Sequence, residues 1–500
     1  MMPARFNHLS LARVCLQNRS GLSIASGLSE GSFDVLLVRD ANGLPTLPGT
    51  AVAGVLRHLY QKAFSVNEAE ALFGTQSGEH ESTSRIQFSW GAVHDSSNNP
   101  VEGLLLGEDA KKLEQDPVLR LLCEAQPVLR DHVRINHRGT ADGSGKFDRG
   151  TLPPGCRFTL EVALWSERDD DPCWKQVLAL FFSPLFRLGG AVRRGLGALD
   201  VVSIHEIHFN LKDPKQFKQF HGLHRAMGSK DGWHRLKKDP LLRESRTPEV
   251  SGSVPPESAV QYLSLKMTLK PMDFWRFGQG EESLDQASEK RIADQLPLGI
   301  PKITWTEDGL AQMMEQTILI PASAIKGALV HRFVFHLLRF EGRFLEDLEN
   351  PEKYDPRSHK AVQALFGFAQ DGSDHESSGA AGRLLMDDLA RDLPPQTPGQ
   401  WLGRLTHNSQ DRFTAGVRDG ALFTEEMLFD LSWPLTIYII DPYCAALQDP
   451  NLKKALAEVL EDLAQGRLAL GAGETKGHGI FTSEKVSWSD GGLWIGELNS

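Results

Sequence analysis

The apolar residues of the chain follow two different periods. Residues 8–11 and 262–267 alternate apolar with polar side chains, a pattern typical of half-buried β-strands. Residues 48–57 and 321–329 carry apolar side chains at helical spacing directly after a proline, with a Ser or Thr as the expected helix cap. Each half of the chain is therefore predicted to contain a first strand and, after it, an amphipathic helix.

These segments belong to a series that occurs twice in the same order, which indicates an internal repeat. The further pairs are Ala-Leu-Phe-Gly at 71–74 and 364–367, a short strand at 84–88 and 382–386, a loop at 137–141 and 411–415, and a glycine-rich turn at 188–197 and 470–479. So many landmarks in one order are hard to obtain by chance.

Within each copy strands alternate with helices, which predicts an α+β fold with helices on one face of a sheet, as in RNA-recognition folds. We expect one unit over residues 1–210 and a second over 257–490, with residues 491–500 as a C-terminal tail. Residues 211–256 are rich in Lys, Arg, Pro and Ser and are predicted to be a solvated linker, with an RNA-binding arm as the alternative. Residues 281–316 have no counterpart in the first copy and are interpreted as an inserted loop.

The composition is that of a globular protein, and the length of 500 residues allows two to four domains. The net charge of −11 means that any nucleic-acid site is local. The five cysteines are scattered and never spaced as Cys-x-x-Cys, so neither a disulfide framework nor a cysteine zinc site is indicated. No apolar stretch is long enough to span a bilayer and no signal peptide is recognisable, so we expect a cytoplasmic protein without a membrane partner.

Three motifs of the repeat resemble those of a known family. They are Pro-Gly-Thr-Ala-Val-Ala-Gly at 48–54, Leu-Phe-Gly after the helix, and the glycine-rich turn that ends in Gly-Leu-Gly at 195–197. Together they resemble the RAMP superfamily and, more narrowly, the repeated backbone subunits of type III CRISPR-Cas effector complexes. The resemblance covers both halves and implies two tandem ferredoxin-like or RRM-like RAMP domains with inserted thumb loops.

The resemblance also implies partners. Such subunits stack along the CRISPR guide RNA (crRNA), position its duplex with complementary target RNA, and join other protein subunits in a ribonucleoprotein complex for antiviral defense. The family's Gly-Ser-Ser-hydrophobic-Lys-Gly motif is altered in both copies. Ala53 replaces the lysine in the first copy, and Ala322 replaces the first glycine in the second.

Two aspartates are candidates for catalysis. Asp34 lies on the loop after the first strand, where catalytic members of the family carry an aspartate that cleaves target RNA with a divalent metal. Aligning the copies places Asp285 near the same position, with Asp273 and the neighbouring glutamates as competitors. A carboxylate can hold Mg²⁺, or another divalent cation, against a phosphate oxygen. The alternative for both is a surface aspartate that caps a turn.

The candidate RNA contacts combine helix starts, glycines and basic side chains. Helices that begin at Thr50 and Ser323 present free N–H groups to a phosphate, and glycines at 54 and 327 permit close approach of an RNA backbone, although they could equally serve helix packing. The full set is Thr50, Gly54, Arg57, Arg134, His137, Arg138, Arg187, Arg193, Arg194, Ser323, Lys326, Gly327, Arg412, Lys476 and His478.

The resemblance places the thumb of the first unit around residues 130–140. Phe147 and, in the second unit, Phe423 are candidate wedges beside a displaced base, with core packing as the alternative. His132 and His137 could instead perform acid–base chemistry, but we find no equivalent pair in the second unit. The acidic residues 167–171 are interpreted as a solvated turn.

Three functions therefore remain open. The first is a guide-RNA-binding backbone subunit that cleaves target RNA, a metal-dependent endoribonuclease acting through Asp34 and Asp285. The second is a non-catalytic RNA-binding scaffold in the same kind of complex. The third is an endonuclease that processes precursor RNA with His132 or His137. RNA binding is common to all three.

Overall fold

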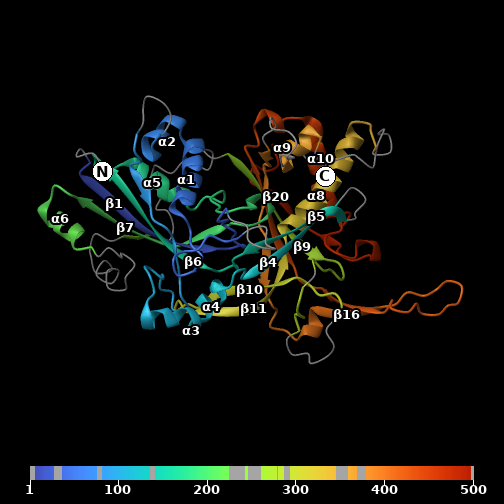
Figure 1. Ribbon diagram of the computed structural model, residues 1–500. Helices are drawn as coiled ribbons and strands as arrows, with labels where there is room; N and C mark the ends of the chain where they lie inside the picture. Colours follow the sequence, from blue (N-terminus) through green and yellow to red (C-terminus); the bar gives the residue numbers. More distant parts are fainter. Residues whose placement is uncertain are drawn as a thin grey trace.

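The structure of the chain is a computed structural model. Figure 1 shows two lobes side by side, one formed by the blue to green part of the chain and one by the yellow to red part, each around its own sheet. The structure describes residues 6–27, 36–75, 82–135, 141–223, 243–245, 261–278, 280–285, 293–344, 358–368 and 379–496.

The sheet of the first unit has its first strand, β1 (His8–Asn18), at the centre. It pairs antiparallel with β6 (Arg157–Ser166) on one side and with β7 (Leu199–Asn210) on the other, and β2 (Ile86–Phe88) pairs with the outer edge of β6. The spatial order of the strands is β2-β6-β1-β7, and the two helices that cover the sheet follow β1 and β6 in the chain. This is the ferredoxin-like connectivity.

Two helices cover one face of this sheet. α1 (Gly49–Ala63) buries Val52, Leu56 and Leu59, which form one stripe at helical spacing. α5 (Pro172–Leu180) begins after Asp171, whose carboxylate accepts a hydrogen bond from the Cys173 N–H at 3.0 Å. Nearly every residue of β1 is buried, so the opposite face of the sheet is covered as well.

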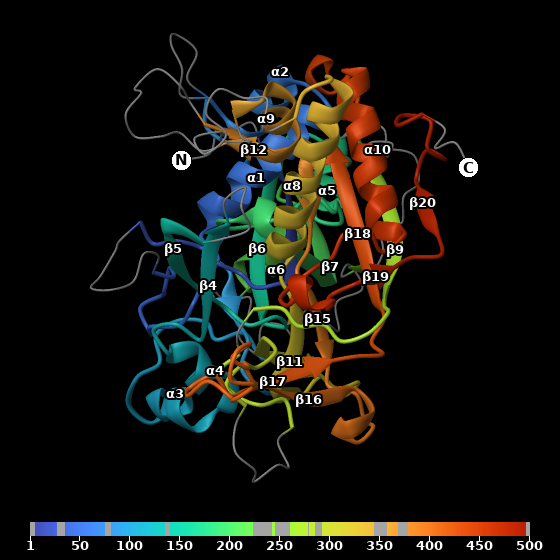
Figure 2. The same ribbon diagram turned by 90° about the vertical axis from the view of Figure 1, so that its right-hand side faces the viewer.

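The second unit repeats this arrangement. Its first strand, β9 (Tyr262–Pro271), lies between β18 (Trp433–Ile440) and β19 (Phe481–Thr482), with β14 (Leu384–Met386) beyond β18. The helices α8 (Ala322–Phe340) and α10 (Pro450–Ala464) lie side by side over β18 and β9 (Figure 2). The predicted α+β class and the two tandem ferredoxin-like units are confirmed.

Each unit carries an inserted hairpin between its second and third sheet strands, where the thumb loops are expected. These are β4 (Val128–Ile135) with β5 (Ala141–Thr151), and β16 (Leu402–His407) with β17 (Phe423–Leu428). The remaining helices and strands are α2 (Val66–Phe73), β3 (Ala92–Val93), α3 (Lys112–Gln115), α4 (Pro117–Cys123), α6 (Pro214–His221), β8 (Arg243–Ser245), β10 (Gly299–Trp305), β11 (Ala311–Ile320), α9 (Lys360–Phe366), β12 (Gly367–Phe368), β13 (Ala380–Ala381), β15 (Leu389–Asp392) and β20 (Val486–Trp488).

The segment interpreted as an inserted loop is partly a hairpin, because β10 and β11 occupy much of residues 299–320. This hairpin joins the two units. Ile303 packs into the core of the first unit, and its N–H donates to the Pro154 carbonyl at 2.9 Å. The Trp305 indole donates to the Gly155 carbonyl at 2.8 Å. The hairpin was missed because its apolar face is covered by the other unit, a contact that local sequence does not show.

Two segments placed outside the units pack against them. In the expected linker, α6 covers the second face of the first sheet, where Phe220 packs with Leu9 and Phe209. In the expected tail, Trp494 is buried in the core of the second unit and donates to the Pro442 carbonyl at 2.7 Å. None of the described helices is long and apolar enough to cross a membrane.

Candidate nucleic-acid interface

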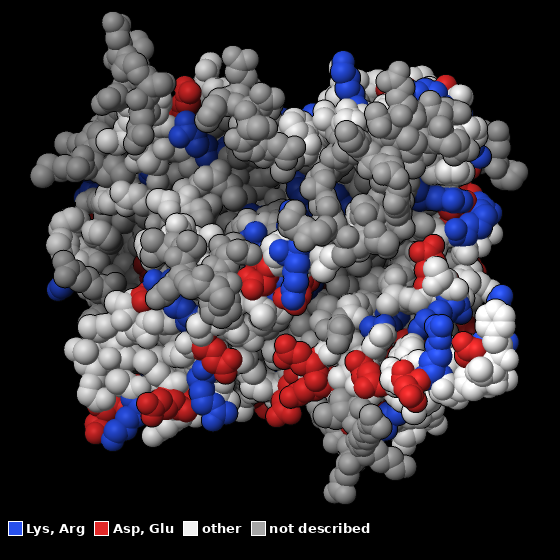
Figure 3. All heavy atoms as spheres, turned by 45° about the vertical axis from the view of Figure 1, so that its right-hand side comes forward, with Lys and Arg blue, Asp and Glu red and all other residues white. Residues whose placement is uncertain are grey.

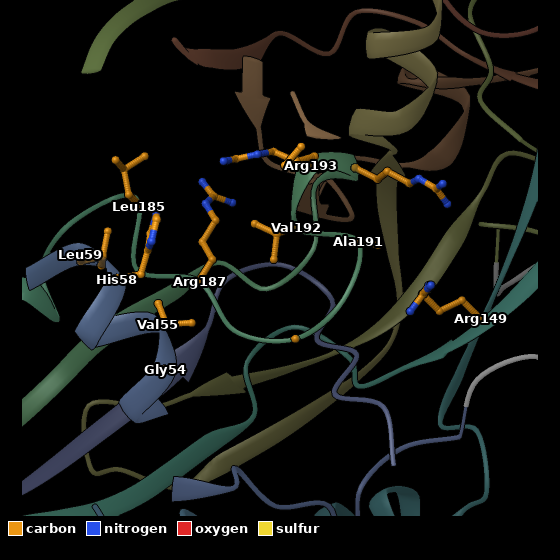
Figure 4. A pocket seen from close by; sticks show the side chains of 13 residues that line it. Gly54, Val55, His58, Leu59, Arg149, Leu185, Arg187, Ala191, Val192 and Arg193 are labelled. Atoms are coloured by element: carbon orange, nitrogen blue, oxygen red, sulfur yellow. The ribbon is translucent and has the colours of Figure 1, made fainter. Parts of the chain in front are cut away.

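A cavity of about 580 Å³, which we call the groove, opens between α1 and the glycine-rich turn of the first unit. Figure 4 shows Arg187 and Arg193 reaching into it from the turn, His58 from α1, and Arg149 from β5 on the far side. None of the described residues that line the cavity carries a carboxylate, and Arg194 adds a fourth guanidinium. Such a concentration of cations suits a polyanion.

The face of the molecule in Figure 3 is mixed in charge. On the face in Figure 3, the described Lys and Arg side chains lie among Asp and Glu rather than forming one continuous basic surface. This agrees with the net charge of −11. The cation-lined cavity is therefore a local feature.

The glycine at the centre of this site has no packing role in the chain. Gly54 is exposed on α1 and lines the cavity, and a Cβ added there would meet nothing within 4 Å. Gly327, its counterpart on α8, has the same open space. Glycine inside a helix costs about 1 kcal/mol relative to alanine. Both glycines therefore lower helix stability, and packing within the chain does not require either of them.

The helix starts differ from the prediction. α1 begins at Gly49 after Pro48, and α8 begins at Ala322 after Pro321, with no side-chain cap from Thr50 or Ser323. The reason is that the helices begin one residue earlier than expected, directly after the proline. In α8 the Ala322 N–H is already bonded to Asp388 Oδ1 at 2.8 Å.

The glycine-rich turns of the two units have matching backbones. Gly189 and Gly471 have φ of +85° and +89°, and Gly197 and Gly479 have +79° and +76°. A Cβ at either of the last two would lie 2.2 Å from a leucine carbonyl oxygen, so only glycine fits there. Between these glycines lies a short 3-10 turn, residues 192–194 in the first unit and 474–476 in the second. It carries the candidate cations Arg193 and Arg194 in the first unit and Lys476 in the second.

Two other candidate cations, Arg187 and Lys326, make contacts between the two units. Arg187 is buried, and its guanidinium pairs with Asp387 of the second unit. Lys326 donates from α8 to the Arg193 carbonyl at 3.1 Å and to the Phe366 carbonyl at 3.3 Å. Burial, with the charges of Arg193 and Arg194, lowers the pKa of Lys326 to about 8. Both side chains are therefore held in place by contacts between the two units.

Phe147 lies midway along the first hairpin, opposite His132. Its ring stacks on His132, its cross-strand neighbour, with centroids 4.9 Å apart, and the Arg194 guanidinium lies 5.0 Å from its centroid. Burial and then the charges of Arg130, Arg194 and Arg149 lower the pKa of His132 to about 4. A histidine with this pKa is neutral at pH 7, which disfavours it as a general acid.

The second hairpin repeats this cluster with His407, Phe423 and Lys476. The two rings lie 5.0 Å apart, and the Lys476 ammonium lies 4.8 Å from the Phe423 centroid. His407 therefore occupies in the second unit the position that His132 has in the first. Reading the repeat backwards from Phe147 and Phe423 would have found it. His137 lies outside the described residues, so the absence of an equivalent pair stays a prediction.

The remaining candidates are scattered. Arg57 is half-buried on α1, Arg412 is exposed near the tip of the second hairpin, and the His478 ring lies 6.2 Å from that of Phe274. Arg134 belongs to β4, but its side chain lies outside the described part of the chain. His137, Arg138 and Asp34 lie outside the described residues altogether.

Asp285 is half-buried, and its N–H donates to Ser283 Oγ at 3.1 Å. Its carboxylate offers the oxygen ligands that Mg²⁺ prefers. However, Arg404 Nη2 lies 3.7 Å from Oδ2, and Asp285 belongs to no group of three ligand side chains among the described residues. The described residues therefore do not complete a magnesium site there.

The chain thus contains two tandem ferredoxin-like units, each with a cation-bearing glycine-rich turn. The model of the RAMP superfamily matches residues 18–200 and 314–482, one match in each unit, and the chain belongs to this superfamily. No curated protein matches the chain. Members are CRISPR-associated RNA-binding subunits of multi-subunit complexes, and some are ribonucleases.

Proposed function

We propose that this chain is a guide-RNA-binding backbone subunit of a type III CRISPR effector complex, acting in the cytoplasm. The observation that carries the proposal is Gly54, a helical glycine exposed to a cavity lined by arginines. The open space above α1 permits close approach of an RNA backbone, and Arg193 and Arg194 supply charge for its phosphates. Pairing between guide and target would read the sequence, so the protein contacts need no base specificity.

The two hairpins fit the second part of this role. Phe147 and Phe423 each lie between a histidine ring and a cation, which fixes the orientation of the phenylalanine ring on its hairpin. An aromatic ring held beside a phosphate-binding turn is suited to stack on a base of the guide–target duplex. We propose that both rings border the duplex where the thumbs meet it.

The test of guide binding compares two double variants that lose the same charge. Arg193→Ala with Arg194→Ala removes cations from the groove, whereas Lys215→Ala with Lys218→Ala removes them from α6, on the other face of the sheet. We expect the first to raise the Kd for guide RNA at least tenfold and to reduce the slope of log Kd against log salt by about 1 to 2. Equal effects of both variants would contradict the proposal.

Cleavage of the target strand is the finer part of the proposal. Asp34 and Asp285 are the candidate carboxylates because each follows the first strand of its unit. A bound divalent cation would supply charge stabilisation at the reacting phosphate. Because Asp285 belongs to no group of three ligand side chains among the described residues, the RNA would have to provide the other ligands.

This part is tested on the assembled complex with labelled target RNA and Mg²⁺. Asp34→Ala and Asp285→Ala should each remove its own set of cuts on a sequencing gel, and the double variant should remove both. Asp273→Ala tests the competing exposed carboxylate that precedes Asp285, and loss of the second set of cuts in this variant instead would transfer the role to Asp273. If all cuts persist with RNA binding unchanged, the chain is a scaffold and the cutting residues belong to another subunit.

A further inference from the structure

Two histidines and an aspartate meet at the end of the first sheet remote from the groove. His8 lies at the start of β1, His208 on the neighbouring strand β7, and Asp169 in the turn between β6 and α5. Ser10 and His208 are direct cross-strand partners, which brings the rings together although they are far apart in sequence. The acidic turn, interpreted as merely solvated, therefore directs one carboxylate at two imidazoles.

The three side chains present their ligand atoms to one point. His8 Nδ1 lies 3.2 Å from His208 Nε2, Asp169 Oδ1 lies 2.8 Å from His208 Nε2, and it lies 3.7 Å from His8 Nδ1. Ligand atoms about 2.0–2.2 Å from a tetrahedral zinc ion are separated from one another by roughly 3.3 Å. The observed triangle has edges of that size, so an ion can sit above it with little movement.

A fourth side chain orients the site. Ser10 Oγ lies 2.9 Å from His208 Nδ1, the ring nitrogen that faces away from the cluster. A hydrogen bond at this nitrogen can fix the tautomer that leaves the Nε2 lone pair free for a metal.

We propose that His8, His208 and Asp169 bind a divalent transition-metal ion of the zinc class and thereby fasten the β6–α5 turn to the sheet. Two imidazoles with one carboxylate suit Zn²⁺ or Co²⁺ better than Mg²⁺, which prefers oxygen ligands. The Asp169 side chain is 79% exposed, so an ion can enter from solvent, and three protein ligands leave one position open.

The site is independent of the groove. β1 spans roughly 33 Å from its first residue to its last, and the cluster lies at its start, whereas the glycine-rich turn packs near Ser23, beyond its end. Metal binding and RNA binding can therefore be measured separately. A failure of this inference leaves the proposed function untouched.

The test uses the full chain, freed of metal with a chelator and titrated with Co²⁺ and Zn²⁺. We expect one ion per chain to give the visible absorption of a four-coordinate Co²⁺ site, displaceable by Zn²⁺, and to raise the melting temperature. His208→Ala and Asp169→Asn should abolish this signal. Ser10→Ala should retain it with affinity weakened about 10–100-fold.

Matched controls separate this site from other metal-binding groups. Asp170→Asn removes the neighbouring exposed carboxylate, and His58→Ala removes an exposed histidine of α1. Both should keep the full signal, and Asp169→Asn should bind RNA like the wild type. The absence of a four-coordinate Co²⁺ spectrum, or a spectrum that survives His208→Ala, would show that the cluster is only a hydrogen-bonded network.

Discussion

Each hairpin pairs a histidine with a phenylalanine, and a cation of the glycine-rich turn lies over the phenylalanine ring, but the two clusters have different electrostatic surroundings. In the first unit, His132 faces the charges of Arg130, Arg149 and Arg194, which help to lower its pKa. In the second unit, His407 Nε2 lies 2.5 Å from the Glu425 carboxylate. Equivalent positions in a repeat have thus acquired opposite neighbours.

Glu425 gathers the cations of the second hairpin. It is buried, and Lys476 and Arg276 lie 3.3 Å and 3.6 Å from its carboxylate. Burial raises its pKa, but the Lys476 hydrogen bond and the charges of Lys476, His407 and Arg276 outweigh this, and the net pKa is lowered. Lys476 of the second unit is therefore paired with a carboxylate, whereas Arg194 of the first unit packs on Phe147, and both side chains are exposed.

The hairpins also differ in what they contact. The first leans on the second unit, where Arg130 and Asp388 form a buried pair at 2.8 Å and Val128 packs with Ile300. The second extends away from the body of the molecule, and Phe413 near its tip is 99% exposed (Figure 1). The described strands of the first hairpin are therefore held against the second unit, and the second hairpin presents an exposed tip to a partner.

The largest expected effect comes from breaking the buried pair between the units. Arg130→Met leaves Asp388 buried without its cation, and we expect the free energy of unfolding to fall by about 3–5 kcal/mol. Urea denaturation measures this. Lys146→Met is the control, because its pair with Asp131 on the same hairpin is exposed and contributes at most about 1 kcal/mol.

A second substitution sharpens this test. Asp388→Asn keeps an oxygen for the Ala322 N–H but removes the charge. In the Arg130→Met background it should therefore restore most of the lost stability. Additive losses in the double variant would mean that the pair does not couple the units.

The next effect separates the two cations that lie over the aromatic rings. Arg194→Ala should raise the Kd for RNA about five- to tenfold with little change in stability. Lys476→Ala should alter the Kd less, but should lower the free energy of unfolding by about 1–3 kcal/mol because buried Glu425 loses a donor. RNA-binding assays and urea denaturation of both variants test this difference. Equal changes of Kd and of unfolding free energy in Arg194→Ala and Lys476→Ala would contradict it.

His132 adds a pH dependence that follows from its surroundings. Its pKa of about 4 in the folded protein is below the value of about 6.5 in an unfolded chain. Between these values the unfolded state takes up the proton first, so stability falls as pH falls. The slope stays below the ceiling of about 1.4 kcal/mol per pH unit because His132 is only partly buried.

His132→Phe keeps an aromatic ring on Phe147 and removes the titration. Unfolding free energies at pH 7 and pH 5 should therefore differ less in this variant than in the wild type. His94 is buried with a pKa also near 4, mainly through burial, and remains in both proteins as the shared background. Identical pH slopes in the two proteins would show that His132 is not charged by unfolding.

The sequence reveals the parts of the molecule that depend on local pattern. The order of apolar segments in the two copies predicts both sheets. The glycine within the first helix makes Gly54 a candidate for close approach of RNA, which stays a prediction although the structure leaves open space beside it. It does not reveal contacts between distant segments. The Arg130–Asp388 pair and the meeting of His8 with His208 depend on strand register and on packing between elements.

Helix starts were missed for a different reason. A Ser or Thr near a proline is a fair cap signal, but in α8 the acceptor is Asp388, which comes from another part of the chain. A carboxylate brought in from outside the helix leaves no local pattern. The same holds for Glu425, whose role becomes visible only beside His407 and Lys476.

The smallest expected effect comes from substitutions of Gly54 and Gly327, which should raise the stability of the free chain but weaken RNA binding. Gly54→Ala and Gly327→Ala each add a Cβ into open space, so each should stabilise the free chain by up to about 1 kcal/mol through helix propensity. If RNA passes close to α1, Gly54→Ala should nevertheless weaken RNA binding, and Gly54→Leu should weaken it further. The same pair of substitutions at Gly327 measures how closely RNA approaches the second unit. A glycine that serves only packing would give the reverse result, with stability lost and the Kd for RNA unchanged.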